Sequence, residues 1–248
     1  MLRLALSILA VTLAATIAQA QGGGAPASRP VVVELFTSQG CSSCPPADAF
    51  LGELAKRPNV LALGFHIDYW DYIGWKDPYA SKLATQRQRL YARAFDLSYV
   101  YTPQIVVNGE AQAVGSERGD VESALKKVAA QPVAGPSLSL ALGRDGALAV
   151  HIGAGKEETA TVWLACFDRE HKTPVTRGEN AGSTLTNYSV VRHFEAIGSW
   201  KGAPLDLQVP AAEMAEYVGG SDRGVAVLVQ RGEVGPILAA EVLSTVGQ

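Results

Sequence analysis

Two of the three cysteines of this chain stand close together, in the segment QGCSSCPP. Cys41 and Cys44 follow an apolar run, VVVELFTS, and precede a segment whose apolar residues recur at helical spacing. A cysteine at the N-terminus of a helix lies near unpaired N–H groups, which favour its thiolate form. Cys41 is therefore the expected nucleophile of a redox pair. Cys44, one turn later, is the expected resolving thiol.

The same C-x-x-C spacing also occurs in inert disulfides and in zinc sites. A structural zinc site needs four ligands, and only Cys166 and four scattered histidines remain in the chain. We therefore favour the redox pair and expect no metal and no cofactor. The inert disulfide and the metal site stay open as alternatives.

The elements that would position this motif can be read from hydrophobic periodicity and turn residues. A buried strand, a helix, a second buried strand, a long amphipathic helix, a hairpin and a final helix are predicted at 31–37, 47–57, 60–67, 79–95, 103–115 and 116–131. Their order, β-α-β-α-β-β-α, resembles the minimal thioredoxin fold over residues 30–131. In that topology GCSSCPP, DYWDYIGWKDP and YTPQ meet at one edge of the sheet.

Two further residues gain a role from this resemblance. Thr102–Pro103 resembles the Thr–cis-Pro that faces the C-x-x-C motif in thioredoxin-like proteins and leaves the preceding backbone open to a bound peptide. The alternative is an ordinary trans proline at the start of a strand. Glu34 resembles the buried acid that such proteins place beneath the cysteines, where it would serve Cys44. The alternative is a buried Glu34 paired with a nearby lysine or arginine.

The segment HIDYWDYIGWKDP is rich in aromatic residues beside the expected edge. Tyr69, Trp70 and Trp75 are candidates for a peptide-binding surface, because tyrosine and tryptophan dominate binding hot spots. They could equally pack this loop onto the long helix. His66 lies within the second strand and is a core residue on the simplest interpretation. A copper site made of Cys41, Cys44 and His66 is a further alternative.

The sequence pattern changes after a predicted linker at residues 132–136. Short apolar segments with regular turns predict an all-β sandwich of about seven strands over residues 137–248. Cys166 alternates with apolar residues in one of these strands and is expected to be a small buried hydrophobe. We expect this second domain to be non-catalytic.

The N-terminal segment is typical of a secretory signal peptide. Residues 1–20 combine Arg3, an apolar stretch and Ala18-Gln19-Ala20, and residues 21–29 form a flexible lead-in. A periplasmic or secreted location, where disulfides persist, is therefore expected. Cleavage removes one of 21 basic residues against 24 acidic ones, which gives a net charge of −4. We expect no nucleic-acid partner and, after cleavage, no membrane association.

The whole layout resembles a family of exported bacterial proteins with a thioredoxin-like first half and no assigned function. SQGCSSCPPAD, HIDYWDYIGWKDP and YTPQIVVNG carry this resemblance. The fold we expect is an α/β thioredoxin-like domain followed by an all-β sandwich domain. The function we expect is thiol–disulfide exchange with protein or peptide thiols and disulfides. A non-catalytic binding module and a copper-handling protein are the alternatives.

Overall fold

The computed structural model describes residues 29–132, 135–217 and 222–243. They form a mixed α/β structure with a large mixed sheet and a small antiparallel sheet. The predicted signal peptide, residues 1–20, lies outside the described residues, and so does the lead-in except for Arg29. Across the described ranges, no helix has both the length and the apolar character needed to cross a bilayer.

The first half of the chain alternates strands and helices in the predicted order. Its elements are β1 (Val31–Thr37), α1 (Pro45–Leu54), β2 (Val60–His66), the 3-10 helix η1 (Asp71–Ile73), α2 (Lys82–Ala94), β3 (Gln104–Val107), β4 (Ala111–Val114) and α3 (Arg118–Ala129). β1 and β2 are buried on both faces, which explains their nearly continuous apolar composition. The Ser81 hydroxyl caps α2 by accepting a hydrogen bond from the Ala84 amide at 3.1 Å.

The second half is mostly strand. Its elements are β5 (Leu138–Leu142), β6 (Leu148–Ile152), β7 (Ala160–Pro174), β8 (Thr184–Trp200), β9 (Leu205–Val209), the short helix α4 (Ala211–Met214), β10 (Arg223–Arg231) and β11 (Ile237–Val242). Strands β5, β6 and β9 form the small antiparallel sheet. The remaining four strands belong to the large sheet, together with those of the first half.

The large sheet has the strand order β11-β10-β7-β8-β2-β1-β3-β4. The two halves join between β2 and β8, which run parallel and pair through Gly64 and Val190. A Cβ atom at position 64 would lie 2.9 Å from the Tyr188 carbonyl oxygen, so glycine permits this close approach. The sequence gives no sign of this join, because nothing local in either strand specifies a partner 126 residues away. The predicted domain limits, 30–131 and 137–248, stay a prediction.

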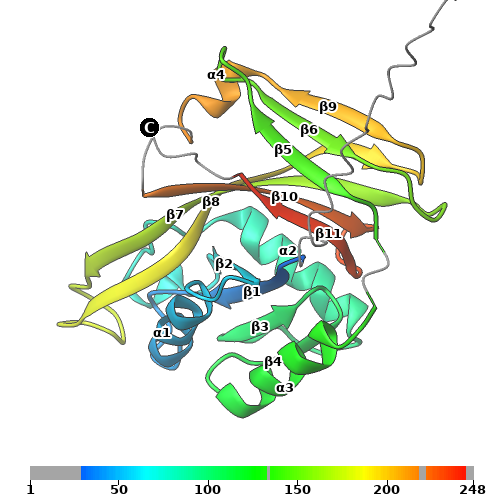
Figure 1. Ribbon diagram of the computed structural model, residues 1–248. Helices are drawn as coiled ribbons and strands as arrows, with labels where there is room; N and C mark the ends of the chain where they lie inside the picture. Colours follow the sequence, from blue (N-terminus) through cyan, green and yellow to red (C-terminus); the bar gives the residue numbers. More distant parts are fainter. Residues whose placement is uncertain (1–28, 133–134, 218–221, 244–248) are drawn as a thin grey trace, which may run out of the picture.

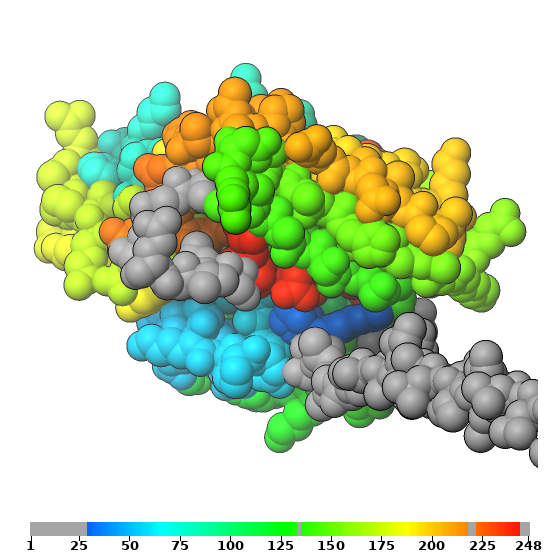
Figure 2. All heavy atoms as spheres, turned by 45° about the horizontal axis from the view of Figure 1, so that its top comes forward, coloured from blue at the N-terminus to red at the C-terminus, as the bar shows by residue number. Residues whose placement is uncertain are grey.

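Three hydrophobic layers hold these elements together. α1 and α3 pack on one face of β1–β3 through Val33, Leu35 and their neighbours. α2 packs on the opposite face, beside Val32 and Phe36. The small sheet covers the outer face of β7, β10 and β11, so these three strands are covered on both faces. From another side, β11 (red) lies between β5 (green) and the start of β1 (blue) (Figures 1 and 2).

Cys166 lies in the outermost of these cores and is fully buried. Burial, together with the charges of Glu195 and Glu216, raises the pKa of its thiol to about 12. A thiol of this kind is protonated at neutral pH and has little nucleophilic character. Its environment therefore agrees with the interpretation of Cys166 as a small buried hydrophobe.

Candidate functional site

Cys41 and Cys44 form a disulfide directly before α1, with their Cα atoms 5.4 Å apart. Cys44 is the N-cap residue of this helix, and its carbonyl oxygen accepts hydrogen bonds from the amides of Ala47 and Asp48. The motif follows the carboxyl end of β1, as predicted. Both cysteines are buried, although the intervening Ser42 and Ser43 are exposed.

The segment that ends in Pro103 lies beside this disulfide. The Thr102–Pro103 peptide bond is cis, as the sequence analysis favours. The Ser43 hydroxyl lies 3.3 Å from the Cys41 sulfur and 3.5 Å from the Thr102 carbonyl oxygen. The side chain between the two cysteines therefore joins the motif to the proline segment, and two of the three segments predicted to converge do so.

The aromatic loop after β2 supplies the third segment. Trp70 donates its indole N–H to the Thr102 hydroxyl at 2.8 Å and stacks on Tyr72, whose side chain is 81% exposed. The Tyr69 hydroxyl donates to the Gln88 side chain on α2 at 3.0 Å and also lies near the Thr102 side chain. Burial raises the pKa of Tyr69 to about 12. Of the aromatic candidates, Trp70 and Tyr69 therefore both adjoin the proline segment, and Tyr69 also fixes the loop to α2.

A buried polar network supports the residues before Cys41. The Gln39 amide donates to the Asp77 carboxylate at 2.8 Å, and the Gln39 side chain joins Trp75 to Asn187 of β8. His66 Nδ1 lies 2.7 Å from the same Asp77 oxygen. Burial lowers the pKa of His66, but the charge and hydrogen bond of Asp77, together with the charge of Asp48, leave this pKa above the ordinary value. Burial raises the pKa of Asp77, but the charge of His66 and the hydrogen bonds to this carboxylate leave it below the usual value.

This network engages His66 with Asp77, and so gives no support to the copper site of Cys41, Cys44 and His66. Within the described ranges, no three His, Cys, Asp or Glu side chains are arranged to hold a metal ion.

Glu34 lies on the face of the sheet opposite α1. Its carboxylate receives two hydrogen bonds from Arg87, at 2.5 and 3.1 Å, and one from the Tyr91 hydroxyl at 2.5 Å. Arg87 also donates to Gln230 of β10, so this buried network links α2 to both halves of the sheet. Of the two interpretations of Glu34, the geometry favours the arginine-paired one and places the carboxylate away from Cys44.

A different carboxyl group lies on the motif's side of the sheet. Asp48 follows Cys44 by one helical turn and is 4% exposed. Burial raises its pKa to about 7, against a smaller lowering by the charge of His66. Thr37 and Asn187 also act on this carboxyl group, yet neither the Thr37 hydroxyl nor the Asn187 amide nitrogen has a partner at ordinary hydrogen-bond geometry. This buried acid therefore sits among under-bonded polar groups and titrates near neutrality.

The turn between β7 and β8 completes the surroundings of the motif. Asn180 donates its side-chain N–H groups to the carbonyl oxygens of Gln39 and Cys41, at 2.9 and 3.0 Å. The Glu179 carboxylate accepts a hydrogen bond from the Ser42 amide at 3.1 Å. The second half of the chain thus contributes directly to the site.

Comparison with known protein families identifies the family of this chain. The family model described as "Protein of unknown function (DUF1223)" matches residues 32–230. The chain belongs to this family.

Two solved structures have the same overall arrangement. A crystal structure of an Agrobacterium tumefaciens protein is 35% identical, with a TM-score of 0.75, over 90% of this chain and 98% of that one. HBP35 of Porphyromonas gingivalis is 14% identical, with a TM-score of 0.61, over 89% of this chain and 78% of that one, and so shows the fold alone. No protein with curated annotation matches the sequence.

In this member of the DUF1223 family, sequence reasoning missed Asp48, Gln39, Glu179 and Asn180. Asp48 had a local signal, because an acid one turn after Cys44 shares its side of the helix. In the first turn of a helix, however, aspartate is equally expected as a partner of the dipole. The other three gave no signal of this role, since the contacts that join them to the other half of the chain span 137 to 148 residues.

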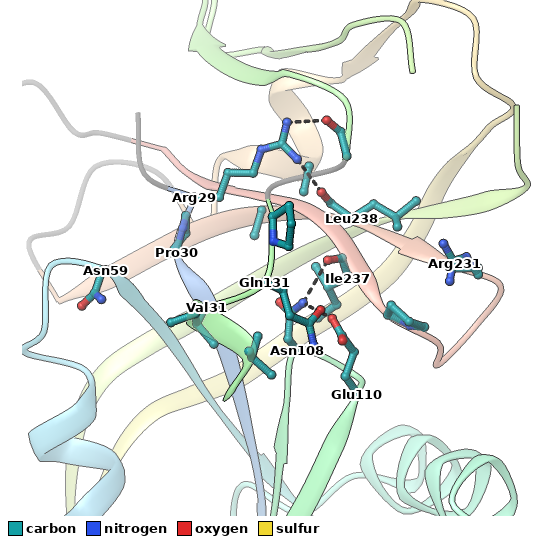
Figure 3. A pocket seen from close by; sticks show the side chains of 17 residues that line it. Arg29, Pro30, Val31, Asn59, Asn108, Glu110, Gln131, Arg231, Ile237 and Leu238 are labelled. Carbon is teal, nitrogen blue, oxygen red and sulfur yellow. Dashed lines mark hydrogen bonds between the residues drawn. The ribbon is translucent and has the colours of Figure 1, made fainter. Parts of the chain in front are cut away.

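A cavity of about 390 Å³ lies far from the disulfide, at the opposite end of β1 (Figure 3). Several of its polar groups already have partners. Arg29 donates to backbone carbonyl oxygens, among them that of Leu238, and Asn108 donates to Glu110 and to the Ile237 carbonyl oxygen. These bonds join β11 to the first half, so we interpret this cavity as part of the seam between the halves.

Proposed function

We propose that this protein is a thiol–disulfide oxidoreductase whose working pair is Cys41 and Cys44. One observation carries the proposal: the pair closes a disulfide at the N-terminus of α1, and Ser43 between the cysteines reaches the carbonyl oxygen before Pro103. A helix N-terminus favours the thiolate that exchange requires. A cis proline beside the motif leaves the Thr102 backbone available to a partner's extended chain.

The fold we propose for residues 30–131 is a thioredoxin-like unit. The order β-α-β-α-β-β-α and the placement of the motif before α1 support this interpretation. For residues 137–248 we propose a sandwich of the small sheet on β7, β10 and β11, which has no catalytic role. Its buried Cys166, whose pKa is raised to about 12, supports that assignment.

The exchange reaction follows from the two sulfurs. In the reduced protein, the Cys41 thiolate attacks one sulfur of a partner disulfide, forms a mixed disulfide and releases the partner's first thiolate, which takes up a proton. Cys44 then attacks the Cys41 sulfur and releases the second thiolate. The partner gains two electrons and two protons, and the protein forms the Cys41–Cys44 disulfide. The reverse sequence oxidises a partner dithiol.

We assign to Asp48 the role of accepting the proton that the Cys44 thiol must lose. Cys44 is fully buried and must lose its proton before it attacks the mixed disulfide. Asp48 lies one turn away on the same helix, and a pKa of about 7 suits a group that accepts and returns a proton near neutral pH. The ion pair of Glu34 with Arg87 leaves that carboxylate without this role.

The partner surface that we propose borders the proline segment. Trp70 bonds to Thr102 and stacks on the exposed Tyr72, and Tyr99, which is 71% exposed, forms an edge contact with Tyr101. Aromatic side chains at an exposed edge suit a peptide or protein partner. We propose protein or peptide thiols and disulfides as partners. The net charge of −4 after signal cleavage disfavours nucleic acid and anionic membranes.

The location that we propose is periplasmic or secreted. The apolar stretch and the Ala18-Gln19-Ala20 pattern of residues 1–20 support export. A disulfide that must survive between turnovers also suits an oxidising compartment.

The test of this function uses a defined peptide that contains one disulfide. Cys44→Ser should accumulate a mixed disulfide at Cys41, which a mass shift of the intact protein detects. Cys41→Ser should form none, and Cys166→Ser should turn over like the wild type. Absence of both turnover by the wild type and capture by Cys44→Ser would sink the proposal.

One observation favours a second function, a binding module in which the disulfide only holds the loop. Cys41 is 1% exposed, which is unusual for a nucleophile that must meet a partner sulfur. In this case, the double variant Cys41→Ser and Cys44→Ser should still bind the aromatic-surface partner. The peptide assay separates the two functions, because a binding module forms no mixed disulfide.

A further inference from the structure

The β7–β8 turn reaches the disulfide because β7 and β8 extend beyond the end of the neighbouring strand β10. β10 pairs with β7 only from Ala160 to Asp168. Beyond that point β7 and β8 continue as a two-stranded ribbon beside α1 (Figure 1). The ribbon fits closely, because a Cβ atom at Gly52 of α1 would lie 2.5 Å from the Tyr188 ring. Residues 175–183 are thereby delivered to the start of α1.

The turn then grips the motif by its backbone. Asn180 bonds to the carbonyl oxygens of Gln39 and Cys41, and Glu179 bonds to the amide of Ser42. These groups belong to the loop that carries the nucleophile. The turn therefore contacts the backbone of Cys41, of Ser42 after it and of Gln39 two residues before it.

The turn also packs against the aromatic loop. Gly178 has a φ of +74°, a conformation that favours glycine, and a Cβ atom there would lie 3.1 Å from the Trp75 Cβ. This contact closes the side of the site that faces the second half of the chain.

Cys41, which the turn holds by its backbone, is buried, whereas the two serines after it are not. Cys41 is 1% exposed, whereas Ser42 and Ser43 are exposed. A partner sulfur must approach the Cys41 sulfur directly to exchange with it. The turn is bonded to the backbone of Cys41, so we expect exchange to require the turn to move.

The two contact residues differ in how they respond to reduction. The Asn180 amide donates to neutral carbonyl groups, whose charge does not change with the redox state. Glu179 holds an N–H group adjacent to Cys41, and a Cys41 thiolate would repel its carboxylate and compete for the same donor. Reduction therefore weakens one of the two attachments.

We propose that the β7–β8 turn is a specificity-determining part of the redox site, which acts through Glu179 and Asn180. It covers Cys41 in the disulfide form and loosens on reduction, so a bulky partner must displace it to exchange. This inference rests on the proposed function. It predicts that a protein dithiol meets a barrier that a small dithiol does not.

Trypsin reports directly on the turn, because Arg177 is exposed within it. Arg144, in the exposed β5–β6 turn, is the internal control. Dithiothreitol reduces the protein disulfide by transferring two electrons and two protons and closing its own ring. In the wild type, cleavage after Arg177 should accelerate on reduction, while cleavage after Arg144 stays constant.

Two variants separate the roles of charge and neutral hydrogen bonding. Asn180→Ala removes two hydrogen bonds, which should raise cleavage after Arg177 by roughly 30-fold in the oxidised protein. Glu179→Gln keeps an acceptor for Ser42 but removes the charge, so its cleavage should stay slow in both redox states. The inference would be overturned if the rate of cleavage after Arg177 were the same in the oxidised wild type, the reduced wild type and oxidised Asn180→Ala. This result would count against the inference whether or not the protein is an oxidoreductase.

Exchange kinetics test the specificity itself. Reduced thioredoxin serves as the protein dithiol and dithiothreitol as the small one, and Arg177→Ala is the matched control within the turn. The disulfide of Asn180→Ala should be reduced by thioredoxin up to roughly 30-fold faster than that of the wild type. With dithiothreitol the increase in rate should be less than about threefold. If the wild type exchanges measurably and Asn180→Ala exchanges at the same rate, the covering role of the turn is refuted, but the proposed oxidoreductase function is not. No exchange by any variant, and no capture by Cys44→Ser, would refute the function instead.

Discussion

Asp48→Asn is the perturbation whose magnitude follows most directly from the structure. Asp48 is buried in α1, and burial raises its pKa from 3.8 to about 7. The unfolded chain carries an ordinary aspartate. Between pH 4 and pH 7 the folded protein therefore binds one proton more than the unfolded chain, and its stability falls as the pH rises. Asparagine has nearly the same shape but cannot ionise.

The difference between the two proteins should depend on pH. Each unit of pKa difference corresponds to about 1.4 kcal/mol, so the wild type should lose roughly 3 kcal/mol of unfolding free energy relative to Asp48→Asn between pH 5 and pH 8. His66 and Asp77 also titrate nearby, but they are present in both proteins, and their coupling to Asp48 is part of the difference.

Urea unfolding of the oxidised proteins at pH 5, 6, 7 and 8 measures this effect. Asp120→Asn, which alters an exposed carboxylate on α3, is the control and should run parallel to the wild type. Parallel curves for the wild type and Asp48→Asn would refute the argument, because they would mean that Asp48 is ionised throughout this range.

Three further predictions concern the α2 face of the sheet, the aromatic loop and the core of the second half. Glu34→Gln leaves Arg87 buried without its counter-charge, and should lower the unfolding free energy in urea by roughly 3–5 kcal/mol while peptide exchange by the folded protein stays unchanged. Trp70→Phe loses the hydrogen bond to Thr102, and should weaken mixed-disulfide capture by Cys44→Ser roughly five- to tenfold with no change in reduction by dithiothreitol. Cys166 should react with a maleimide only after unfolding, and labelling of the native protein would contradict its burial.

Local patterns predicted much of the first half. The C-x-x-C motif after a buried strand, the hairpin at 103–115 and the Thr–Pro pair each depend on neighbours in the sequence, and each was placed correctly. Hydrophobic periodicity also gave the strands of the second half, because apolar alternation marks a half-buried strand wherever it pairs.

Contacts between residues far apart in the sequence could not be predicted from local patterns. The identity of Glu34 predicts a buried carboxylate, but only the fold reveals that α2 brings Arg87 to it. Likewise, β7 and β8 read as strands, yet nothing local tells that they extend past their neighbour and carry Asn180 to Cys41. Strand length relative to the partner decides this, and partners are set by tertiary packing.

The separation of Cys41 from Asn180 also bears on the order in which the protein is made. Asn180 follows Cys41 by 139 residues. The motif therefore emerges from the ribosome, or from an export channel, long before the turn that covers it. Closing a loop of this length is slow compared with forming α1. During biosynthesis Cys41 thus passes through a period of full accessibility, and an oxidant can close the disulfide before the mature cover is in place.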